Sequence, residues 1–314
     1  MSLATILQIK ACAEPAAEGK LVPRLRMQAP EPPRVYAGRP RGIRTRSDVR
    51  QAGGQRMQDI IGPYGANYGK VLLEGLHNTR DLGGLPASEG HVTPRRLLRS
   101  GMLEPATAED MRVLRDVYDV RLVIDLRTDE EAARWPDPIE LLPGARLVHL
   151  PVFRAPKTDD AQETIRALGE RLASGELDIA GLFAGLYPRF VLDEDGIAAY
   201  RGLFRELLDL EDGAALWHCS AGKDRCGMAS VLVEAALGVP WELIERDYLA
   251  TNELIEAKGA AQNMFDVGGV DARYLHAALS AIDETYGSID GYLADALGVD
   301  EAARSELRRK FVSA

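Results

Sequence analysis

Residues 213–240 read GAALWHCSAGKDRCGMASVLVEAALGVP, and they are the most informative segment for the architecture of this chain. The segment begins with an apolar run, which is typical of a buried strand, and continues into a short loop of glycine and polar residues. Apolar residues then dominate until Gly238 and Pro240 supply a helix stop. A strand, a loop and a helix are therefore expected in that order, which is a unit of an α/β sheet.

Short apolar runs bounded by turn residues lie upstream of this segment and are predicted to be strands. They are VLLEGL (71–76), RRLLRS (95–100), RLVIDL (121–126) and ARLVHLPVF (145–153). Residues 106–118 have helical spacing with acidic residues early, as helix N-termini prefer, and they precede the third run.

The rest of the chain is predicted to be helical. The expected helices cover residues 161–175, 179–191, 195–212, 241–257, 272–287 and 289–312. The first three form a helical insertion, which could cover the site as a lid or only contribute to the core. We expect one α/β domain over residues 67–314, with a central mostly parallel sheet flanked by helices.

The composition is that of a globular protein of 314 residues, with 46% hydrophobic and 27% charged residues. No run reaches the roughly 18 uncharged apolar residues that a membrane helix needs. The formal net charge is -10, and residues 57–314 carry 27 basic against 44 acidic side chains. General binding of nucleic acid by this part is therefore not expected, and an anionic substrate would have to be held locally.

The N-terminal arm, residues 1–66, is rich in proline, glycine and arginine and lacks sustained periodicity. Residues 1–56 carry eleven basic and four acidic side chains. We expect a flexible arm, either a solvated tail or a basic segment that makes peripheral contact with anionic membranes or partners.

Three cysteines, at positions 12, 219 and 226, are too few and too unevenly placed for a disulfide framework, which favours a reducing compartment. The first residues contain no basic region ahead of their short apolar run, so a secretory signal is not expected. The predicted location is the cytoplasm.

The chemistry is expected in the loop HCSAGKDRCG, residues 218–227. A loop between a strand end and a helix N-terminus points backbone N–H groups inward and so forms an anion cradle. The same field lowers the pKa of a cysteine, so Cys219 is expected to be a thiolate that can attack phosphorus. Gly222 lets the backbone curl, and Arg225 offers a planar fork to two phosphate oxygens.

This loop resembles the HCxxGKDRTG signature of a bacterial tyrosine phosphatase family whose members also act on phosphoinositides. Further segments resemble other elements of that family in the same order. They are HNTRDLGG (77–84), RLLRSGML (96–103), VIDLRTDEE (123–131) and RDYLATNE (246–253). The resemblance spans about residues 70 to 314.

The resemblance implies that Cys219 is the nucleophile and Arg225 the phosphate clamp, with Lys223 and Asp224 as the loop pair that distinguishes this group. It also implies a metal-free and cofactor-free reaction, in which the phosphate-binding set is Ser220, Ala221, Gly222, Lys223, Asp224 and Arg225.

The general acid has two candidates. Asp125 follows a predicted strand at the sheet edge where the loop lies, and it is our first choice. It could instead simply pair with Arg127 or Arg80, and Asp224 is the rival acid.

Four further residues are expected to support the loop. Arg80, Asp81 and Arg127 are expected to be ion-pair scaffolding, because a buried arginine needs a carboxylate. His218 is expected to orient the loop or to lower the pKa of the thiol. The other histidines are scattered along the sequence, so no metal site is predicted.

Cys226 departs from the family pattern, which has threonine at this place. The threonine hydroxyl can donate to the departing thiolate, and a thiol is a poorer donor. Three hypotheses follow: a slower second step, a Cys219–Cys226 disulfide that shields the nucleophile from oxidation, or a small side chain that only packs.

The sequence thus predicts a Cys-dependent phosphomonoester hydrolase of the tyrosine phosphatase fold, acting on phosphotyrosine and phosphoinositides. Its expected partners are phosphorylated proteins or phosphoinositides. The alternatives are a phosphate-binding pseudophosphatase and a rhodanese-like sulfurtransferase, against which the RDLGG and DLR elements argue.

Overall fold

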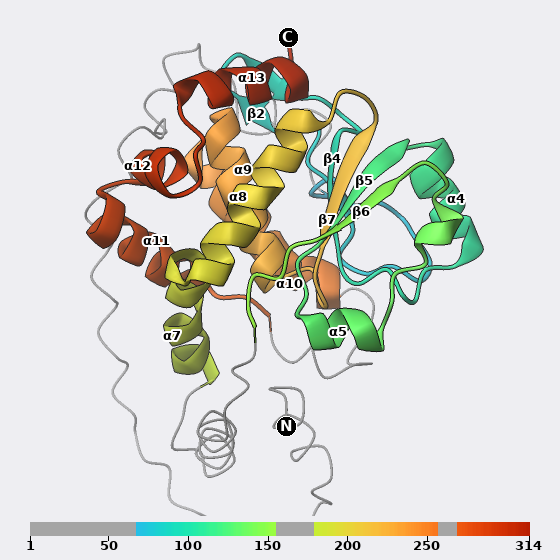
Figure 1. The fold of residues 1–314 in the computed structure, drawn as a ribbon, viewed down its shortest axis with the longest axis horizontal. Helices are drawn as coiled ribbons and strands as arrows, with labels where there is room; N and C mark the ends of the chain where they lie inside the picture. Colours follow the sequence, from blue (N-terminus) through green and yellow to red (C-terminus); the bar gives the residue numbers. More distant parts are fainter. Residues whose placement is uncertain (1–66, 155–178, 257–268) are drawn as a thin grey trace, which may run out of the picture. The chain divides into compact units, whose positions relative to one another are not determined.

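The computed structural model describes residues 67–154, 179–256 and 269–314 (Figure 1). The N-terminal arm and the helix expected over 161–175 lie outside the described residues. None of the helices in these three described ranges is long and apolar enough to cross a membrane.

A five-stranded sheet with the strand order β1-β4-β7-β5-β6 lies at the centre of the described residues. Its strands are β1 (Arg80–Asp81), β4 (Leu97–Ser100), β5 (Val120–Asp125), β6 (Arg146–His149) and β7 (Ala214–His218). Strands β4, β7, β5 and β6 run parallel, and only the short β1 is antiparallel to its neighbour. The α/β architecture with a mostly parallel sheet is therefore confirmed.

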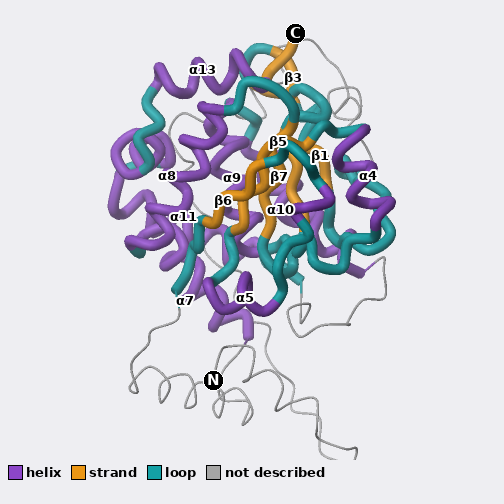
Figure 2. The backbone as a smooth tube through the Cα atoms, turned by 45° about the vertical axis from the view of Figure 1, so that its right-hand side comes forward, coloured by secondary structure: helices purple, strands orange, loops and turns teal. Residues whose placement is uncertain are grey.

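Helices cover both faces of this sheet (Figure 2). They are α4 (Ala108–Asp116), α5 (Asp129–Arg134), α7 (Ile179–Leu192), α8 (Glu194–Asp209), α9 (Asp224–Leu237), α10 (Trp241–Glu256), α11 (Ala272–Tyr286), α12 (Ile289–Gly291) and α13 (Glu301–Phe311). A 3₁₀ turn, η3 (Ile139–Leu141), and a π turn, η4 (Tyr292–Ala296), complete the helical elements.

Alternation along the strands fills two cores, because successive side chains of a strand point to opposite faces. On β7, Ala215 and Trp217 belong to the larger core, which includes side chains of α8, α9 and α10. Ala214 and Leu216 belong to the smaller core, which includes Met111 of α4. All four of these β7 side chains are fully buried, so the strand reads as a continuous apolar run.

The prediction of a strand over residues 71–76 is wrong. This segment has no strand, although Leu73 and Leu76 are buried in the smaller core and Leu72 is 85% exposed. The N–H groups of Glu74 and Gly75 donate to the carboxylate of Asp110 in α4 at 2.7 and 2.8 Å, so they do not pair with a strand.

The prediction of continuous helix over 289–312 is also wrong, because the segment is broken and ends in a strand. Gly298 adopts φ 73° and interrupts the helices before α13. After α13 the chain enters β8 (Val312–Ser313), which joins β2 (Pro86–Ala87) and β3 (Gly90–Val92) in a small antiparallel sheet. Strands this short carry no sequence signal of their own.

The register of the central sheet places three polar residues in one row at its carboxyl edge. Ser100 pairs with His218, and His218 pairs with Asp125. The loops that follow these residues therefore begin side by side, at the edge where α/β proteins hold their ligands.

Candidate active site

The loop between β7 and α9 is held from behind by two side chains of neighbouring segments. Nδ2 of Asn78 donates to the carbonyl oxygens of Ala221 and Gly222 at 3.2 and 2.9 Å. Arg99 of β4 donates to the Gly222 carbonyl at 2.9 Å. These bonds fix the loop directly before the first turn of α9, and such a junction between a strand and a helix N-terminus commonly binds anions.

Gly222 is required for this conformation on two grounds. Its φ is 66°, in the left-handed region that costs a side chain energy. A Cβ atom at this place would also meet the backbone of Ser100 and Gly101 at 2.6 Å. The loop therefore lies directly against the chain that follows β4.

Cys219 is the first residue of the loop and is 2% exposed. Burial raises the pKa of this thiol, but hydrogen bonds from Cys226 and the charge of Arg225 outweigh burial and lower the pKa to about 5. Cys219 is therefore a thiolate at neutral pH, and thiolate is the form that acts as a nucleophile.

Cys226 lies in the first turn of α9 and is fully buried. Burial and the neighbouring Cys219 thiolate raise its pKa well above the usual range, so Cys226 keeps its proton. Its S–H also faces the carbonyl oxygens of Ser100 at 3.7 Å and Trp217 at 3.9 Å. The Cys226 side chain also lowers the pKa of Cys219 by hydrogen bonding, and neither cysteine forms a disulfide.

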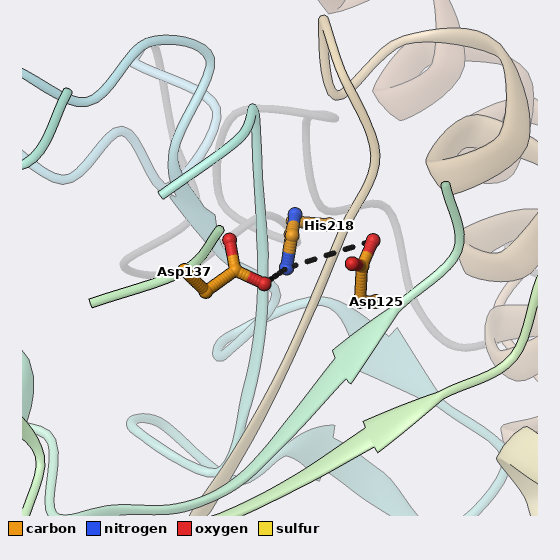
Figure 3. Close-up of side chains that lie close together, drawn as sticks. All are labelled: Asp125, Asp137 and His218. Atoms are coloured by element: carbon orange, nitrogen blue, oxygen red, sulfur yellow. Dashed lines mark hydrogen bonds and ion pairs between the residues drawn. The ribbon is translucent and has the colours of Figure 1, made fainter. Parts of the chain in front are cut away.

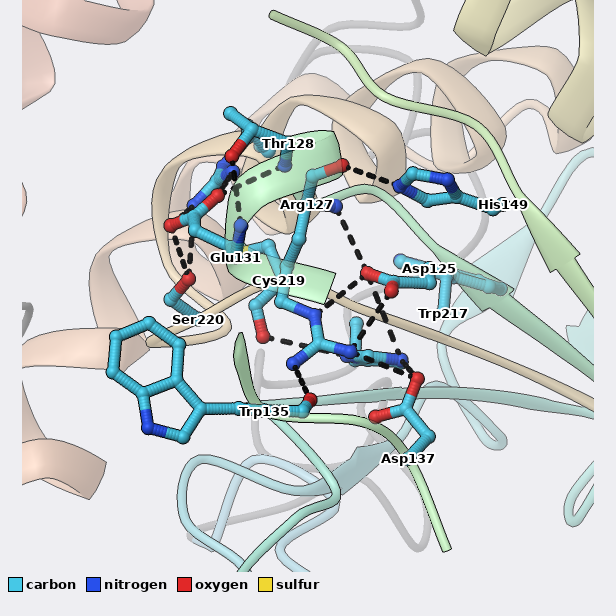
Figure 4. A network of polar contacts seen from close by, with 12 residues as sticks. Asp125, Arg127, Thr128, Glu131, Trp135, Asp137, His149, Trp217, Cys219 and Ser220 are labelled. Carbon is cyan, nitrogen blue, oxygen red and sulfur yellow. Dashed lines mark hydrogen bonds and ion pairs between the residues drawn. The ribbon is translucent and has the colours of Figure 1, made fainter. Parts of the chain in front are cut away.

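Arg225 is oriented by Glu131. Figure 4 shows Glu131 on α5, close to Ser220. The two terminal nitrogens of Arg225 donate to Oε2 and Oε1 of Glu131 at 2.5 and 3.1 Å, and Oγ of Ser220 donates to Oε1 at 2.6 Å. A guanidinium has five N–H groups, so this pair does not exhaust its donors. The fork is thereby fixed beside Cys219.

A capping box places Glu131. Thr128 caps α5 by accepting from the N–H of Glu131, and Glu131 accepts from the N–H of Thr128. Burial raises the pKa of Glu131, but the charge and hydrogen bonds of Arg225 and Ser220 outweigh it and lower the pKa to about 2. The carboxylate of Glu131 is therefore ionised at neutral pH.

Asp125, at the end of β5, forms a two-pronged ion pair with Arg127. Nε and Nη2 of Arg127 donate to the two carboxylate oxygens at 2.8 and 2.9 Å, and its backbone N–H donates at 2.9 Å. Burial raises the pKa of Asp125, but the charges of His218 and Arg127 and the hydrogen bonds of Arg127 hold it below its usual range. Asp125 is therefore an ionised, buried acceptor.

His218, Asp125 and Asp137 approach one another on the other side of this pair (Figure 3). Nε2 of His218 lies 3.0 Å from Oδ2 of Asp137 and 3.9 Å from Oδ1 of Asp125. Burial lowers the pKa of His218, but Asp137 and Asp125 outweigh it and raise the pKa above its usual range. The imidazole of His218 lies directly before Cys219 in the chain.

The same three side chains offer metal-ligand atoms within 4.8 Å of one another. Nη2 of Arg127 lies 3.0 Å from Oδ2 of Asp137 and 2.9 Å from Oδ2 of Asp125, so one guanidinium already pairs with both carboxylates. A cation would have to displace this guanidinium. The arrangement suits an ion-pair network better than a metal site.

Asp224 has a more accessible carboxylate than Asp125. Its side chain is 17% exposed, against 3% for Asp125. Oδ1 accepts from the hydroxyl of Tyr187 at 2.8 Å, and Oδ2 lies 4.0 Å from Nζ of Lys223. The ammonium of Lys223 lies 5.3 Å from the centre of the Phe183 ring.

Arg80 and Asp81 form the edge strand β1. Arg80 is fully buried and donates to Oδ1 of Asp247 at 3.1 Å. Asp81 accepts backbone N–H groups of Gly83 and Arg95, both at 2.8 Å, and so holds the turn after β1. Arg80 therefore has the carboxylate partner that was expected, whereas the contacts of Asp81 are with backbone.

A profile of the tyrosine phosphatase family matches residues 71–313, which cover most of the chain and all of the site described above. The chain belongs to the tyrosine phosphatase family. It is 34% identical, over 74% of its own length and 85% of the relative's, to a Cupriavidus necator protein whose name assigns it provisionally to the tyrosine-protein phosphatases.

Two further proteins are similar to this tyrosine phosphatase. The triple specificity protein phosphatase PtpB of Mycobacterium tuberculosis is 32% identical, over 75% of this chain and 96% of that protein. The solved structure of Pseudomonas aeruginosa TpbA in complex with phosphotyrosine is 15% identical and covers 62% of this chain and 90% of that one, with a TM-score of 0.26.

Several residues that hold the site of this tyrosine phosphatase were missed by sequence reasoning. Asn78 and Arg99 lie inside motifs that were recognised, but the sequence does not indicate that they bind the loop. Glu131 had a local signal, because Thr128-x-x-Glu131 is a capping box. Asp137 and Tyr187 had none, since both reach the site through tertiary contacts.

Proposed function

We propose that this tyrosine phosphatase hydrolyses phosphomonoesters through a cysteinyl-phosphate on Cys219, with phosphotyrosine as a substrate and phosphoinositides as a second class. The observation that carries this proposal is the buried Cys219 in the loop that connects β7 to α9. Its pKa is about 5, and Arg225 is fixed beside it.

In the first step, the sulfur of Cys219 attacks phosphorus, and the bond between phosphorus and the leaving oxygen breaks. Arg225 and the loop N–H groups neutralise the charge that spreads over the phosphoryl oxygens. The general acid gives its proton to the leaving oxygen. In the second step, the same carboxylate takes a proton from water, which attacks phosphorus, and the S–P bond breaks to release inorganic phosphate.

Asp224 is the better candidate for the general acid. A proton donor has to reach the leaving oxygen. Asp224 is the first residue of α9, and its carboxyl group is partly exposed. Asp125 has both oxygens engaged by Arg127 and its pKa is held low. We therefore assign Asp125 to the support of Arg127 and His218.

The proposed phosphoinositide activity rests on Lys223. Its ammonium gives the loop a cationic side chain besides Arg225, which suits headgroups that carry more than one phosphate. The Mycobacterium relative has triple specificity in its name, which is consistent with more than one substrate class.

The central test compares the wild type with Cys219→Ser on phosphotyrosine peptides, phosphoserine peptides and phosphoinositides, with release of inorganic phosphate as the readout. We expect release from the first and third classes by the wild type and none by the variant. Rapid quenching should trap a phosphoenzyme only in the wild type. Binding of phosphopeptide without turnover would indicate a pseudophosphatase, and transfer of sulfur from thiosulfate to cyanide would indicate a sulfurtransferase.

The general acid is tested with two leaving groups. Asp224→Asn should lower kcat/KM, which reports the first step, by about 10²- to 10⁴-fold with phenyl phosphate, whose leaving group needs a proton. It should change kcat/KM much less with dinitrophenyl phosphate, whose leaving group does not need one. Asp125→Asn should affect both esters alike, and the reverse pattern would exchange the two roles.

A further inference from the structure

Two buried tyrosines connect the helical region to Asp224. The hydroxyl of Tyr187, in α7, lies 2.8 Å from Oδ1 of Asp224, and the hydroxyl of Tyr248, in α10, lies 2.7 Å from that of Tyr187. Both tyrosines are fully buried, and their rings meet edge to face at 6.2 Å between centroids. Two hydroxyls therefore form a chain that ends on the carboxyl group of Asp224.

The carboxyl group of Asp224 determines which hydroxyl donates in each hydrogen bond of this chain. A carboxyl oxygen that carries no proton only accepts hydrogen bonds, so Tyr187 donates to Oδ1 of Asp224 and its own oxygen accepts from Tyr248. Burial and the nearby charge of Asp224 raise the pKa of Tyr187 well above the usual range. Tyr187 therefore keeps its proton throughout and is a fixed donor.

We propose that Tyr187 is a positioning residue for the general acid, and that its hydroxyl holds Oδ1 of Asp224 so that Oδ2 carries the proton that is transferred. This inference rests on the proposed role of Asp224. In the first step the proton moves from Oδ2 to the leaving oxygen and the carboxylate remains. In the second step Oδ2 takes a proton from water. Tyr187 donates to Oδ1 in both steps.

The two carboxyl oxygens of Asp224 have different surroundings. Oδ1 faces the buried hydroxyl, whereas Oδ2 lies 4.0 Å from the ammonium of Lys223, at the loop that binds phosphate in the proposed reaction. A carboxyl group without Tyr187 could turn about its last bond and present either oxygen. Most of its orientations would then miss the leaving oxygen, which lowers the rate of proton transfer.

The test uses Tyr187→Phe with Tyr292→Phe as the matched control. Tyr292 is equally buried, and its hydroxyl has no hydrogen-bond partner within the described residues. We expect Tyr187→Phe to lower kcat/KM about 10-fold with phenyl phosphate, which is the effect of losing one hydrogen bond to a charged group. With dinitrophenyl phosphate the loss in kcat/KM should be less than about twofold, because kcat/KM reports the first step and this leaving group needs no proton. Tyr292→Phe should behave as the wild type with both esters.

Removal of one hydroxyl leaves that of Tyr248 without its acceptor, which could destabilise the variant. The double variant Tyr187→Phe/Tyr248→Phe removes both partners and should show the same difference between the two esters. Equal losses with both esters in the single and the double variant would overturn the positioning role. A failure of the proposed function is distinguishable, because Asp224→Asn itself would then lose activity equally with both esters.

Discussion

Two cysteines seven residues apart show how a single contact sets the ionisation of a buried group. Cys219 and Cys226 are both buried, and burial alone raises the pKa of a thiol. The pKa of Cys226 is raised well above its usual range, whereas that of Cys219 falls to about 5. The difference arises because Cys219 faces Arg225 and receives the S–H of Cys226, while Cys226 faces a thiolate.

Cys226→Ala should therefore raise the pKa of Cys219 above about 5, because the thiolate loses a donor. The same change should slow the hydrolysis of the phosphoenzyme about 10-fold, since the sulfur leaves as a thiolate in that step. The rate of alkylation by iodoacetamide as a function of pH reports the pKa, and stopped-flow kinetics with dinitrophenyl phosphate report the burst.

The control for this prediction is Cys226→Thr, which supplies a hydroxyl donor. It should keep the pKa of Cys219 near that of the wild type and speed the second step. If the alanine and threonine variants have the same alkylation profile, then Cys226 only packs against its neighbours and the proposed hydrogen bond is unimportant.

At the level of elements, a short helix does most to organise the site. The sequence predicts the strands β4, β5, β6 and β7 and the helix α4 correctly, because periodic apolar runs and caps are local signals. It does not predict that Glu131 of α5 meets Arg225, since that contact spans 94 residues and depends on the strand order. The loop of residues 218–227 was predictable because its residues are contiguous, while Asn78, Arg99 and Glu131, which hold it, lie in other segments of the chain.

Residues 71–76 show the opposite failure. Their apolar run suggests a strand, but only Val71, Leu73 and Leu76 lie in a core, while the backbone donates to Asp110. An apolar run therefore indicates that some of its side chains are buried, without fixing the backbone conformation.

Glu131→Gln tests the part played by α5 and should change the pH dependence of stability. The pKa of Glu131 is 4.5 in its ordinary state and about 2 in the folded protein. A lowered pKa means stability that is present above pH 4.5 and is lost as the pH falls toward about 2. The free energy of unfolding of the wild type should exceed that of the variant by roughly 3 kcal/mol at neutral pH, and this difference should disappear in acid.

Urea unfolding of both proteins between neutral and acid pH measures this gap. The variant should also lose about 10- to 100-fold in kcat/KM, because the fork of Arg225 is no longer held. A gap in unfolding free energy that does not change with pH would show that the carboxylate charge of Glu131 contributes nothing and that only its packing matters.

At the scale of the whole molecule, a buried charge cluster joins the sheet to α10 and to the loop. Asp247 accepts from Arg80 at 3.1 Å and from Arg99 at 2.8 Å, and Arg99 also donates to the Gly222 carbonyl. Burial and the charge of Asp247 raise the pKa of Glu234 well above its usual range, so this neighbouring carboxyl is protonated. Stability and loop geometry therefore depend on the same carboxylate.

Asp247→Asn should destabilise the protein by about 3 to 5 kcal/mol, because two buried guanidinium groups lose their counter-charge. Its kcat/KM should fall as well, since Arg99 positions the loop.

The adjacent Glu234 can ionise in place of Asp247 and recover part of the lost stability. The Asp247→Asn/Glu234→Gln variant should therefore be less stable than Asp247→Asn alone. The urea midpoint of unfolding measures the stability of the single and the double variant. Glu109→Gln is the reference: it breaks the exposed pair Glu109–Arg112 and should leave the midpoint unchanged. Equal midpoints for the single and double variants would show that Glu234 does not share the charge of this cluster.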